Sequence, residues 1–282
     1  MEPGKVLFEH YHKIASDFLD YLSKIPGVFE MEDVHQLRVS IKKLRAIFDF
    51  FQEATDGKLM AGPNYSTLKP LFKTAGRIRE HQINASLLNE YKASEEIQDA
   101  FLRMVDLTDR SDKKQLEEEI RNFDRQAFDA IETDIKKYCE NEPGHAIVGH
   151  MHQFIQNQFQ LVQQIMTGNL NNKLVHKIRI RLKTIKPLLG LAWQLPGSPY
   201  TEHDFLKLEE TEKFIGSWHD QVLLIEVLDR IMRSPQLSSG PLLETIRDLM
   251  LHIEDQSHQL LEQIHTSLAH TASEIENKSI PN

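Results

Sequence analysis

The sequence predicts an all-α protein made of two tandem homologous four-helix bundles, and three observations favour this fold class. Apolar residues recur at helical spacing almost throughout the 282-residue chain, and no segment shows the convincing alternation of a β-strand. The 12 glycines and 11 prolines are few and cluster in short breaks between segments of helical length. Two motifs recur in the same order half a chain apart, which indicates that the second half repeats the first.

The chain contains eight segments of helical length, and breaks rich in Gly and Pro separate most of them. We expect the breaks near residues 26–27, 55–64, 142–144, 196–199 and 234–241. We expect helices over residues 5–24, 31–54, 65–92, 95–139, 146–168, 170–194, 202–233 and 240–275. Residues 108–111 are predicted to split the fourth segment, so the chain holds about eight to ten helices. The repeat predicts two units, 1–141 and 142–282.

The first repeated motif is a basic ladder near the start of segments 31–54 and 170–194. It consists of one histidine and three cations spaced by three, four and three residues. The ladders are His35, Arg38, Lys42 and Arg45 in the first half and His176, Arg179, Lys183 and Lys186 in the second. At 3.6 residues per turn, this spacing places each set on one helix face beside an apolar stripe. No acid lies within residues 35–45 or 176–186, so the counter-charge must come from another helix or from a ligand.

A histidine begins each ladder. A lone histidine is more often a surface or packing residue than a ligand, but His35 and His176 occupy matching positions, which favours a functional role. The charge of a histidine is adjustable near neutral pH. Partial protonation of these two side chains would therefore strengthen anion binding as the pH falls.

The second repeated motif is a glycine followed by a basic residue and an acid. Lys73, Gly76, Arg79 and Glu80 match Lys213, Gly216, His219 and Asp220. Glycine inside a helix costs about 1 kcal/mol relative to alanine. Glycines at matching places indicate either close helix packing or a kink, or alternatively a helix break. The two acids are expected to pair with and orient the neighbouring arginines.

The cations are concentrated in three windows, although the net charge of the chain is −9. Residues 34–48, 57–79 and 170–201 contain 15 Lys and Arg and no Asp or Glu, which leaves a net charge of −24 on the rest. This distribution excludes a protein that is basic all over, such as a nucleic-acid coat protein. It indicates either a confined positive site for an anionic partner or three solvated basic faces balanced by acidic neighbours.

With these two motifs the sequence resembles the CHAD family, the conserved histidine α-helical domain. The resemblance covers essentially the whole chain. It implies two four-helix bundles related by pseudo-two-fold symmetry, with a basic groove between them that binds inorganic polyphosphate. The groove residues that the resemblance implies are His35, Arg38, Lys42, Lys43, Arg45, Lys69, Lys73, Arg77, Arg79, His176, Arg179, Arg181, Lys183, Lys186, Lys213 and His219.

The second half departs from this pattern more than the first. In the alignment of the two halves, Ser217 matches Arg77, Thr184 matches Lys43 and Glu209 matches Lys69. Arg181 adds a charge where the first half has Ser40. In the first half, Glu80 replaces the more usual aspartate. The second copy of the second motif therefore carries fewer cations.

We expect no metal, no cofactor and no catalytic residue. His145, His150, His152 and Cys139 fit no standard zinc spacing. The sequence has no P-loop and no other nucleotide-binding glycine-rich turn, and the acid-free windows lack carboxylates that would hold a metal for phosphoryl transfer. The sequence therefore favours a non-enzymatic binding protein. The alternatives are a binder of nucleic acid or another phosphate polyanion, and an accessory module to an enzyme that processes triphosphate or other phosphates.

The expected partner is inorganic polyphosphate. Nucleic acid is disfavoured because no aromatic residues interleave with the ladders. The chain has one cysteine, no apolar run of membrane-spanning length and no signal-peptide pattern at its start. We therefore expect no membrane span and a cytoplasmic location, with polyphosphate granules as a location that the resemblance suggests.

Overall fold

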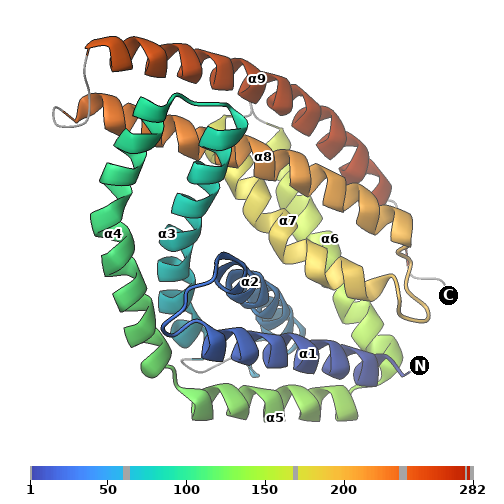
Figure 1. Cartoon of the computed structure of the whole chain (residues 1–282). Coiled ribbons are helices and arrows are strands. Elements are labelled where there is room, and N and C mark those ends of the chain that lie inside the picture. Colours follow the sequence, from blue (N-terminus) through green and yellow to red (C-terminus); the bar gives the residue numbers. More distant parts are fainter. Residues whose placement is uncertain (1, 60–63, 168–170, 235–239, 277, 280–282) are drawn as a thin grey trace.

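The computed structural model describes residues 2–59, 64–167, 171–234, 240–276 and 278–279. Within these residues the chain forms nine α-helices and no strand (Figure 1), so the predicted all-α class is confirmed. The helices are α1 (Pro3–Lys24), α2 (Met31–Ala54), α3 (Asn64–Glu90), α4 (Glu95–Arg121), α5 (Arg125–Asn141), α6 (Gly144–Met166), α7 (Asn172–Ala192), α8 (Glu202–Arg233) and α9 (Gly240–Glu276).

The predicted helix ends agree with the structure except inside the fourth predicted segment. The breaks expected at 55–64 and 234–241 lie partly outside the described residues, as do residues 168 and 170. The break expected at 108–111 is wrong, because α4 continues through it. The Thr108 hydroxyl donates to the Val105 carbonyl, so this polar side chain is satisfied within the helix. The chain breaks instead before α5, where the Asp124 carboxylate accepts from the backbone N–H of Ala127.

One hydrophobic core joins the two halves of the chain. Helix α2 contacts α7, α1 packs on α2, and α6 packs on α7. The apolar stripes predicted beside the ladders are buried in this core. They are Val34, Leu37, Ile41, Leu44, Phe48 and Phe51 of α2, and Val175, Ile178, Leu182, Ile185 and Leu189 of α7. Burial of the stripes fixes the direction in which each ladder faces. The division into units 1–141 and 142–282 falls between α5 and α6 and stays a prediction.

A second, smaller hydrophobic core joins the halves where α3 ends and α4 begins. Leu88 of α3 and Phe101 of α4 pack there with Leu224 of α8 and Ile246 of α9. Helix α3 contacts α8, and the contacts of α2 with α3, α2 with α7 and α7 with α8 complete a ring of four helices. Figure 1 shows α4 outside α3 and α9 outside α8. The two cores therefore hold the four helices that carry the repeated motifs in fixed positions relative to one another.

Candidate functional site

A cavity of about 1170 Å³ lies among α2, α3, α7 and α8 and contains the repeated motifs. Ten of the sixteen predicted site residues line it. They are His35, Arg38, Lys42, Arg45, Lys69, Lys73, Arg77 and Arg79 from the first half, and Arg179 and His219 from the second. Eight of the 15 cations of the acid-free windows lie here. These windows therefore contribute to one confined basic site, as the first of the two alternatives predicts.

Two further predicted residues adjoin the cavity without lining it. The ring centroid of His176 lies 5.3 Å from that of His219. Lys183 lies close enough to Lys42 for the charge of Lys42 to lower its pKa. The ladder of α7 therefore meets the ladder of α2, although the two helices come from different halves of the chain.

The remaining four predicted residues, Lys43, Arg181, Lys186 and Lys213, lie outside the cavity. The side chains of Lys43 and Lys213 are exposed. Arg181 turns toward α6, where its Nη1 donates to Gln158 Oε1 over 3.0 Å. Successive helical residues lie about 100° apart around the axis. A residue one or two positions from a ladder residue therefore faces elsewhere, which explains the directions of Lys43 and Arg181.

Arg38 is held in the cavity by the part of α3 that contains Gly76. Its Nη1 donates a hydrogen bond to the carbonyl oxygen of Phe72 over 2.8 Å, and its guanidinium lies 4.6 Å from the centroid of the Phe72 ring. The guanidinium of Arg45 lies 5.1 Å from the same centroid. A Cβ atom at residue 76 would overlap Arg38 Nη1. Gly76 therefore permits a close approach of α2 and α3, as one of the alternatives for this glycine predicts.

Gly216 occupies the matching position in α8, but its surroundings differ. A Cβ atom there would meet no other residue within 4 Å, so close packing does not explain it. Helix α8 continues through Gly216, as α3 continues through Gly76. The alternative that these glycines break their helices is therefore wrong.

The acids that follow the two glycines have different partners. Glu80 Oε1 lies 3.7 Å from Arg230 Nη2 of α8, so this ion pair links the halves. Burial raises the pKa of Asp220, and the nearby charge of Arg179 opposes that rise. Arg77 turns toward α4, where its Nε donates to Asp112 Oδ1 over 2.7 Å. Asp220 and Arg179 therefore interact through their charges, whereas Glu80 forms an ion pair across the helix interface. That these acids orient the cavity arginines stays a prediction.

Burial and mutual proximity lower the pKa values of the ladder cations. Burial, followed by the charges of neighbouring cations, lowers the pKa of Lys183 to about 6 and that of Lys42 to about 8. The pKa of Arg38 falls to about 10, first through burial and then through the charge of Arg179. The carboxylates nearby do not offset these effects. The cavity of the free protein therefore has an excess of positive charge that an anion would balance.

The pKa values of three histidines at the site are lowered. Burial and then the charge of Arg179 lower the pKa of His219 to about 3. Burial also lowers the pKa values of His35 and His176, and neighbouring cations add to the effect. These shifts act against the partial protonation expected for the ladder histidines. Lys42 and Lys183 titrate closer to neutral pH than His219 does.

Two arginine donors in the cavity have no hydrogen-bond partner among the residues that the structure describes. The Nε atoms of Arg79 and Arg179 are buried and unpaired. Buried unsatisfied N–H groups are rare, because leaving one unpaired costs roughly 1–3 kcal/mol. Both residues line the cavity, so acceptor oxygens of a bound anion are suitable partners.

Comparison with protein families and solved structures identifies the fold. The family model for the CHAD domain matches residues 14–229. The chain belongs to the CHAD domain family. Its structure is similar to the crystal structure of the CHAD domain from the plant Ricinus communis, with a TM-score of 0.70 and 12% identity over 95% of this chain and 92% of that chain. It is also similar to PptA from Streptomyces chartreusis, with a TM-score of 0.65 and 13% identity over 97% of this chain and 100% of that chain. No curated protein matches the chain. The resemblance inferred from the two motifs is therefore confirmed.

Eight residues that line the cavity of this CHAD domain were not predicted as site residues, and Phe72 and Glu212 are two of them. Phe72 and Glu212 stand at matching positions of the two halves, four residues before Gly76 and Gly216. Residues four apart share a helix face. Their position four residues before a repeated glycine could have identified Phe72 and Glu212 as site residues. The match between the two positions is difficult to recognise in the sequence, because one residue is aromatic and the other is acidic.

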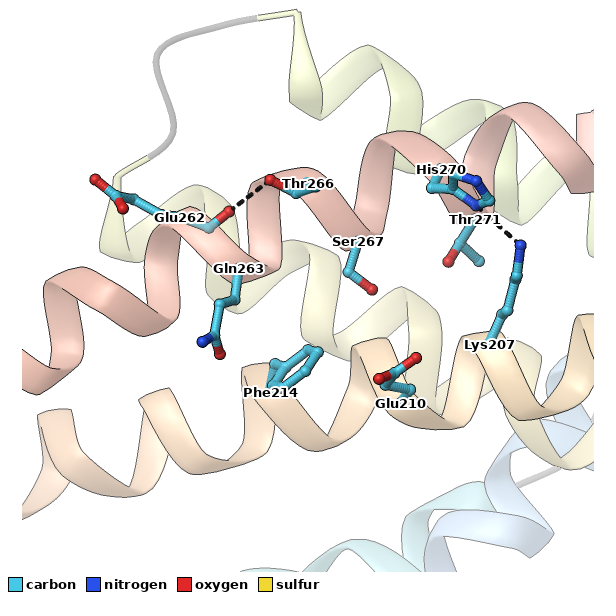
Figure 2. Close-up of a pocket in the computed structure, with 9 residues that line it drawn as sticks. All are labelled: Lys207, Glu210, Phe214, Glu262, Gln263, Thr266, Ser267, His270 and Thr271. Atoms are coloured by element: carbon cyan, nitrogen blue, oxygen red, sulfur yellow. Dashed lines mark hydrogen bonds between the residues drawn. The ribbon is translucent and has the colours of Figure 1, made fainter.

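A second cavity of this CHAD domain lies between α8 and α9 (Figure 2). It has a volume of about 560 Å³ and is lined by Lys207, Glu210, Phe214, Glu262, Gln263, Thr266, Ser267, His270 and Thr271. Lys207 Nζ and His270 Nδ1 form a 3.0 Å hydrogen bond, and the Thr266 hydroxyl donates to the Glu262 carbonyl. Its charged groups are of both signs. It therefore lacks the excess of positive charge that distinguishes the cavity between the ladders.

The histidines near Cys139 serve as hydrogen-bond partners of tyrosines. His150 Nδ1 lies 2.7 Å from the Tyr138 hydroxyl, and His152 Nδ1 lies 3.0 Å from the Tyr200 hydroxyl. Across the residues that the structure describes, no group of three or more His, Cys, Asp or Glu side chains is placed to hold a metal ion. None of the helices in the described ranges is long and apolar enough to span a bilayer.

Proposed function

We propose that this CHAD domain is a non-enzymatic module that binds inorganic polyphosphate in the cavity between the two ladders. The observation that carries the proposal is a cluster of buried cations that lower the pKa values of one another. The unpaired Nε atoms of Arg79 and Arg179 in the same cavity support it. Phosphate oxygens supply both the negative charge and the acceptors that this cluster lacks.

The spacing of the ladder cations suits a linear polymer of phosphates. Neighbouring rungs of a helical ladder lie about 5–6 Å apart. Arginines such as Arg38 and Arg179 offer two parallel donors to phosphate oxygens, whereas Lys42 supplies a point charge. The ladders of α2 and α7 meet at Lys42 and Lys183, so a single chain of phosphates can contact both.

The surroundings of the cavity favour polyphosphate over nucleic acid. The chain outside the three acid-free windows carries a net charge of −24, which repels a bulky polyanion more than a slim one. The Phe72 ring is in contact with the guanidinium groups of Arg38 and Arg45. Nucleic-acid binders without sequence preference stack bases on exposed aromatic rings, and the contacts of Phe72 leave its ring poorly suited to that role.

The non-enzymatic part of the proposal rests on the carboxylates of the cavity. Glu80, Glu212 and Asp220 line it, and each lies near cations of the chain itself. Carboxylates engaged in this way are poorly suited to hold a metal beside a transferring phosphoryl group. Polyphosphate incubated with the protein and Mg²⁺ or Mn²⁺ should therefore release no phosphate, and sustained release would contradict this part of the proposal.

Reversing one ladder charge in each half tests the site. We expect Arg38→Glu with Arg179→Glu to weaken polyphosphate binding more than about 100-fold, because two phosphate contacts are lost and two repulsions are added. The matched control is Lys43→Glu with Lys213→Glu, which makes the same change in net charge at two cations outside the cavity. Labelled polyphosphate is titrated against each variant, and circular dichroism reports whether the helices persist.

Two results would overturn the proposal. One is an equal loss of affinity in the two double variants, which would show that binding follows the net charge of the protein and not the cavity. The other is equal affinity of the unaltered protein for polyphosphate, single-stranded nucleic acid and duplex nucleic acid in matched salt. The expected result is a clear preference for polyphosphate that weakens steeply as salt is raised, because bound counterions are released.

A further inference from the structure

At one of the matching pairs of positions that line the cavity, the two halves carry side chains of different chemistry. Phe72 of α3 and Glu212 of α8 each stand four residues before the repeated glycine and each line the cavity. In the first half the residue is an uncharged aromatic ring. In the second half it is a carboxylate. The repeat therefore places two different chemical groups beside its two copies of the basic ladder.

In the first half, the ladder arginines pack on a neutral partner. The guanidinium groups of Arg38 and Arg45 lie 4.6 and 5.1 Å from the centroid of the Phe72 ring. An aromatic face attracts a cation without cancelling its charge. Phe72 therefore positions these two arginines and leaves their positive charge to act on a ligand.

In the second half, the ladder lysines lie beside an acid. Glu212 Oε2 lies 3.2 Å from Lys186 Nζ, and Glu212 Oε1 lies 3.8 Å from Lys183 Nζ. Glu209 Oε1 lies 3.1 Å from Lys186 Nζ, but its side chain is 47% exposed, against 20% for Glu212. Charges screened by solvent interact weakly, whereas partly buried charges interact more strongly. Of the two acids, Glu212 therefore has the larger effect on the potential inside the cavity.

We propose that Glu212 is an internal counterion that limits the affinity of the second-half ladder for phosphate polymers. The inference rests on the proposed function. A bound phosphate chain must compete with the Glu212 carboxylate for Lys183, which adjoins the cavity, whereas at Phe72 it meets no such competitor. Glu212 is therefore a residue that sets the affinity for polyphosphate. It occupies the position in the second half that matches Phe72 in the first half.

Removing the charge of Glu212 tests the inference. We expect Glu212→Gln to tighten binding of long-chain polyphosphate about fivefold to tenfold at roughly 0.1 M salt, because the polymer no longer meets a repelling carboxylate and gains a phosphate contact at Lys183. The plot of log affinity against log salt should steepen by about one unit for the same reason. Glu212→Asp keeps the charge and should keep the salt dependence of the unaltered protein.

A matched control lies two residues away on another face of α8. Glu210→Gln makes the same change in net charge, but Glu210 lines the cavity between α8 and α9 (Figure 2). We expect this variant to bind polyphosphate almost as the unaltered protein does. Equal gains in the Gln variants of residues 210 and 212 would overturn the inference, because they would show an effect of net charge alone.

The outcomes separate this inference from the function on which it rests. If the unaltered protein binds polyphosphate and Glu212→Gln binds it no more tightly, the counterion role is wrong and the proposed function stands. If neither protein binds polyphosphate, the proposed function itself is wrong. The slope of the salt dependence responds to the number of phosphate contacts, so it also distinguishes a counterion from a residue that only supports the fold of α8.

Discussion

At the scale of single residues, the absence of a side chain at Gly76 decides where the Arg38 guanidinium lies. Arg38 Nη1 occupies the space that a Cβ atom of residue 76 would fill, and it donates from there to the Phe72 carbonyl. The atom that would be displaced is the far end of a flexible side chain. Added bulk at position 76 should therefore move the arginine and leave the packing of the helix backbones intact.

We expect Gly76→Ala to weaken polyphosphate binding about tenfold while the protein stays folded. The new methyl group displaces the Arg38 guanidinium from its hydrogen bond, so the arginine no longer points into the cavity with its two donors aligned. Alanine also favours the helix by about 1 kcal/mol relative to glycine, which offsets part of the strain. Titration with labelled polyphosphate measures the affinity, and urea unfolding measures the free energy of unfolding.

Gly216→Ala is the matched control for this prediction. A Cβ atom at residue 216 would have no neighbour within 4 Å. The substitution should therefore raise the free energy of unfolding by about 1 kcal/mol through helix propensity and leave the affinity nearly unchanged. Equal affinities in the two alanine variants would contradict the role assigned to Gly76.

At the scale of helices, the two ladders are local features of α2 and α7 that acquire new properties where they meet. Lys183 of α7 lies among cations at this contact, and the charge of Lys42 of α2 adds to the effect of burial on its pKa. Together with the charge of Arg179, these influences lower the pKa of Lys183 to about 6. The meeting of the ladders therefore turns one lysine into a group that titrates near neutral pH.

We expect the affinity for polyphosphate to fall as the pH rises above about 6. Lys42 of α2, Arg179 of α7 and Glu212 of α8 lie around Lys183. In the free protein, burial and the two cations lower the pKa of Lys183 more than Glu212 raises it. A bound phosphate chain raises the pKa of Lys183, so binding takes up a proton at any pH between the free and bound values. Linkage then lowers the affinity by up to about tenfold per pH unit for each proton taken up.

Calorimetric titration at pH 7 in buffers with different ionisation enthalpies measures this proton uptake directly. The variant Lys183→Arg keeps a positive charge that does not titrate in this range, so its affinity should depend less on pH. Binding to the unaltered protein without proton uptake at pH 7 would show that Lys183 is already charged in the free state.

At the scale of the whole molecule, the site depends on contacts between the two halves of the chain. The main core contains residues of both halves, and the second core joins α3 and α4 to α8 and α9. The ion pair between Glu80 and Arg230 crosses the same boundary. Neither half alone provides the cavity, because α2 and α3 line one side of it and α7 and α8 line the other.

We expect the protein to unfold in a single transition that polyphosphate shifts to higher temperature. A shared core makes the unfolding of the two halves cooperative. Ligand at about 100 times its dissociation constant adds roughly 2.7 kcal/mol to the free energy of unfolding, because it binds the folded state alone. Scanning calorimetry with and without polyphosphate measures both effects. Two resolved transitions, of which polyphosphate shifts one, would show that the halves are independent.

Much of the fold was predictable because its signals are local. The apolar stripes, the Gly- and Pro-rich breaks and the 3.6-residue period place most helix ends and the direction of each ladder. The expected break at residues 108–111 was wrong because polar residues there stay on the solvated side of a continuous α4. The two repeated motifs sufficed to predict the family that the comparison confirms.

The sequence by itself determined the all-α class, the two basic ladders and their repetition. Only the tertiary structure decided which cations meet: it joins Lys42 to Lys183, turns Arg181 toward α6 and brings Glu212 against the second ladder. It also decided the lowered pKa values of His35, His176 and His219, because a pKa depends on burial and on every charge nearby. Helix period and propensity are set by neighbours along the chain, whereas burial and electrostatic pairing are set by residues that lie far apart in sequence and close together in space.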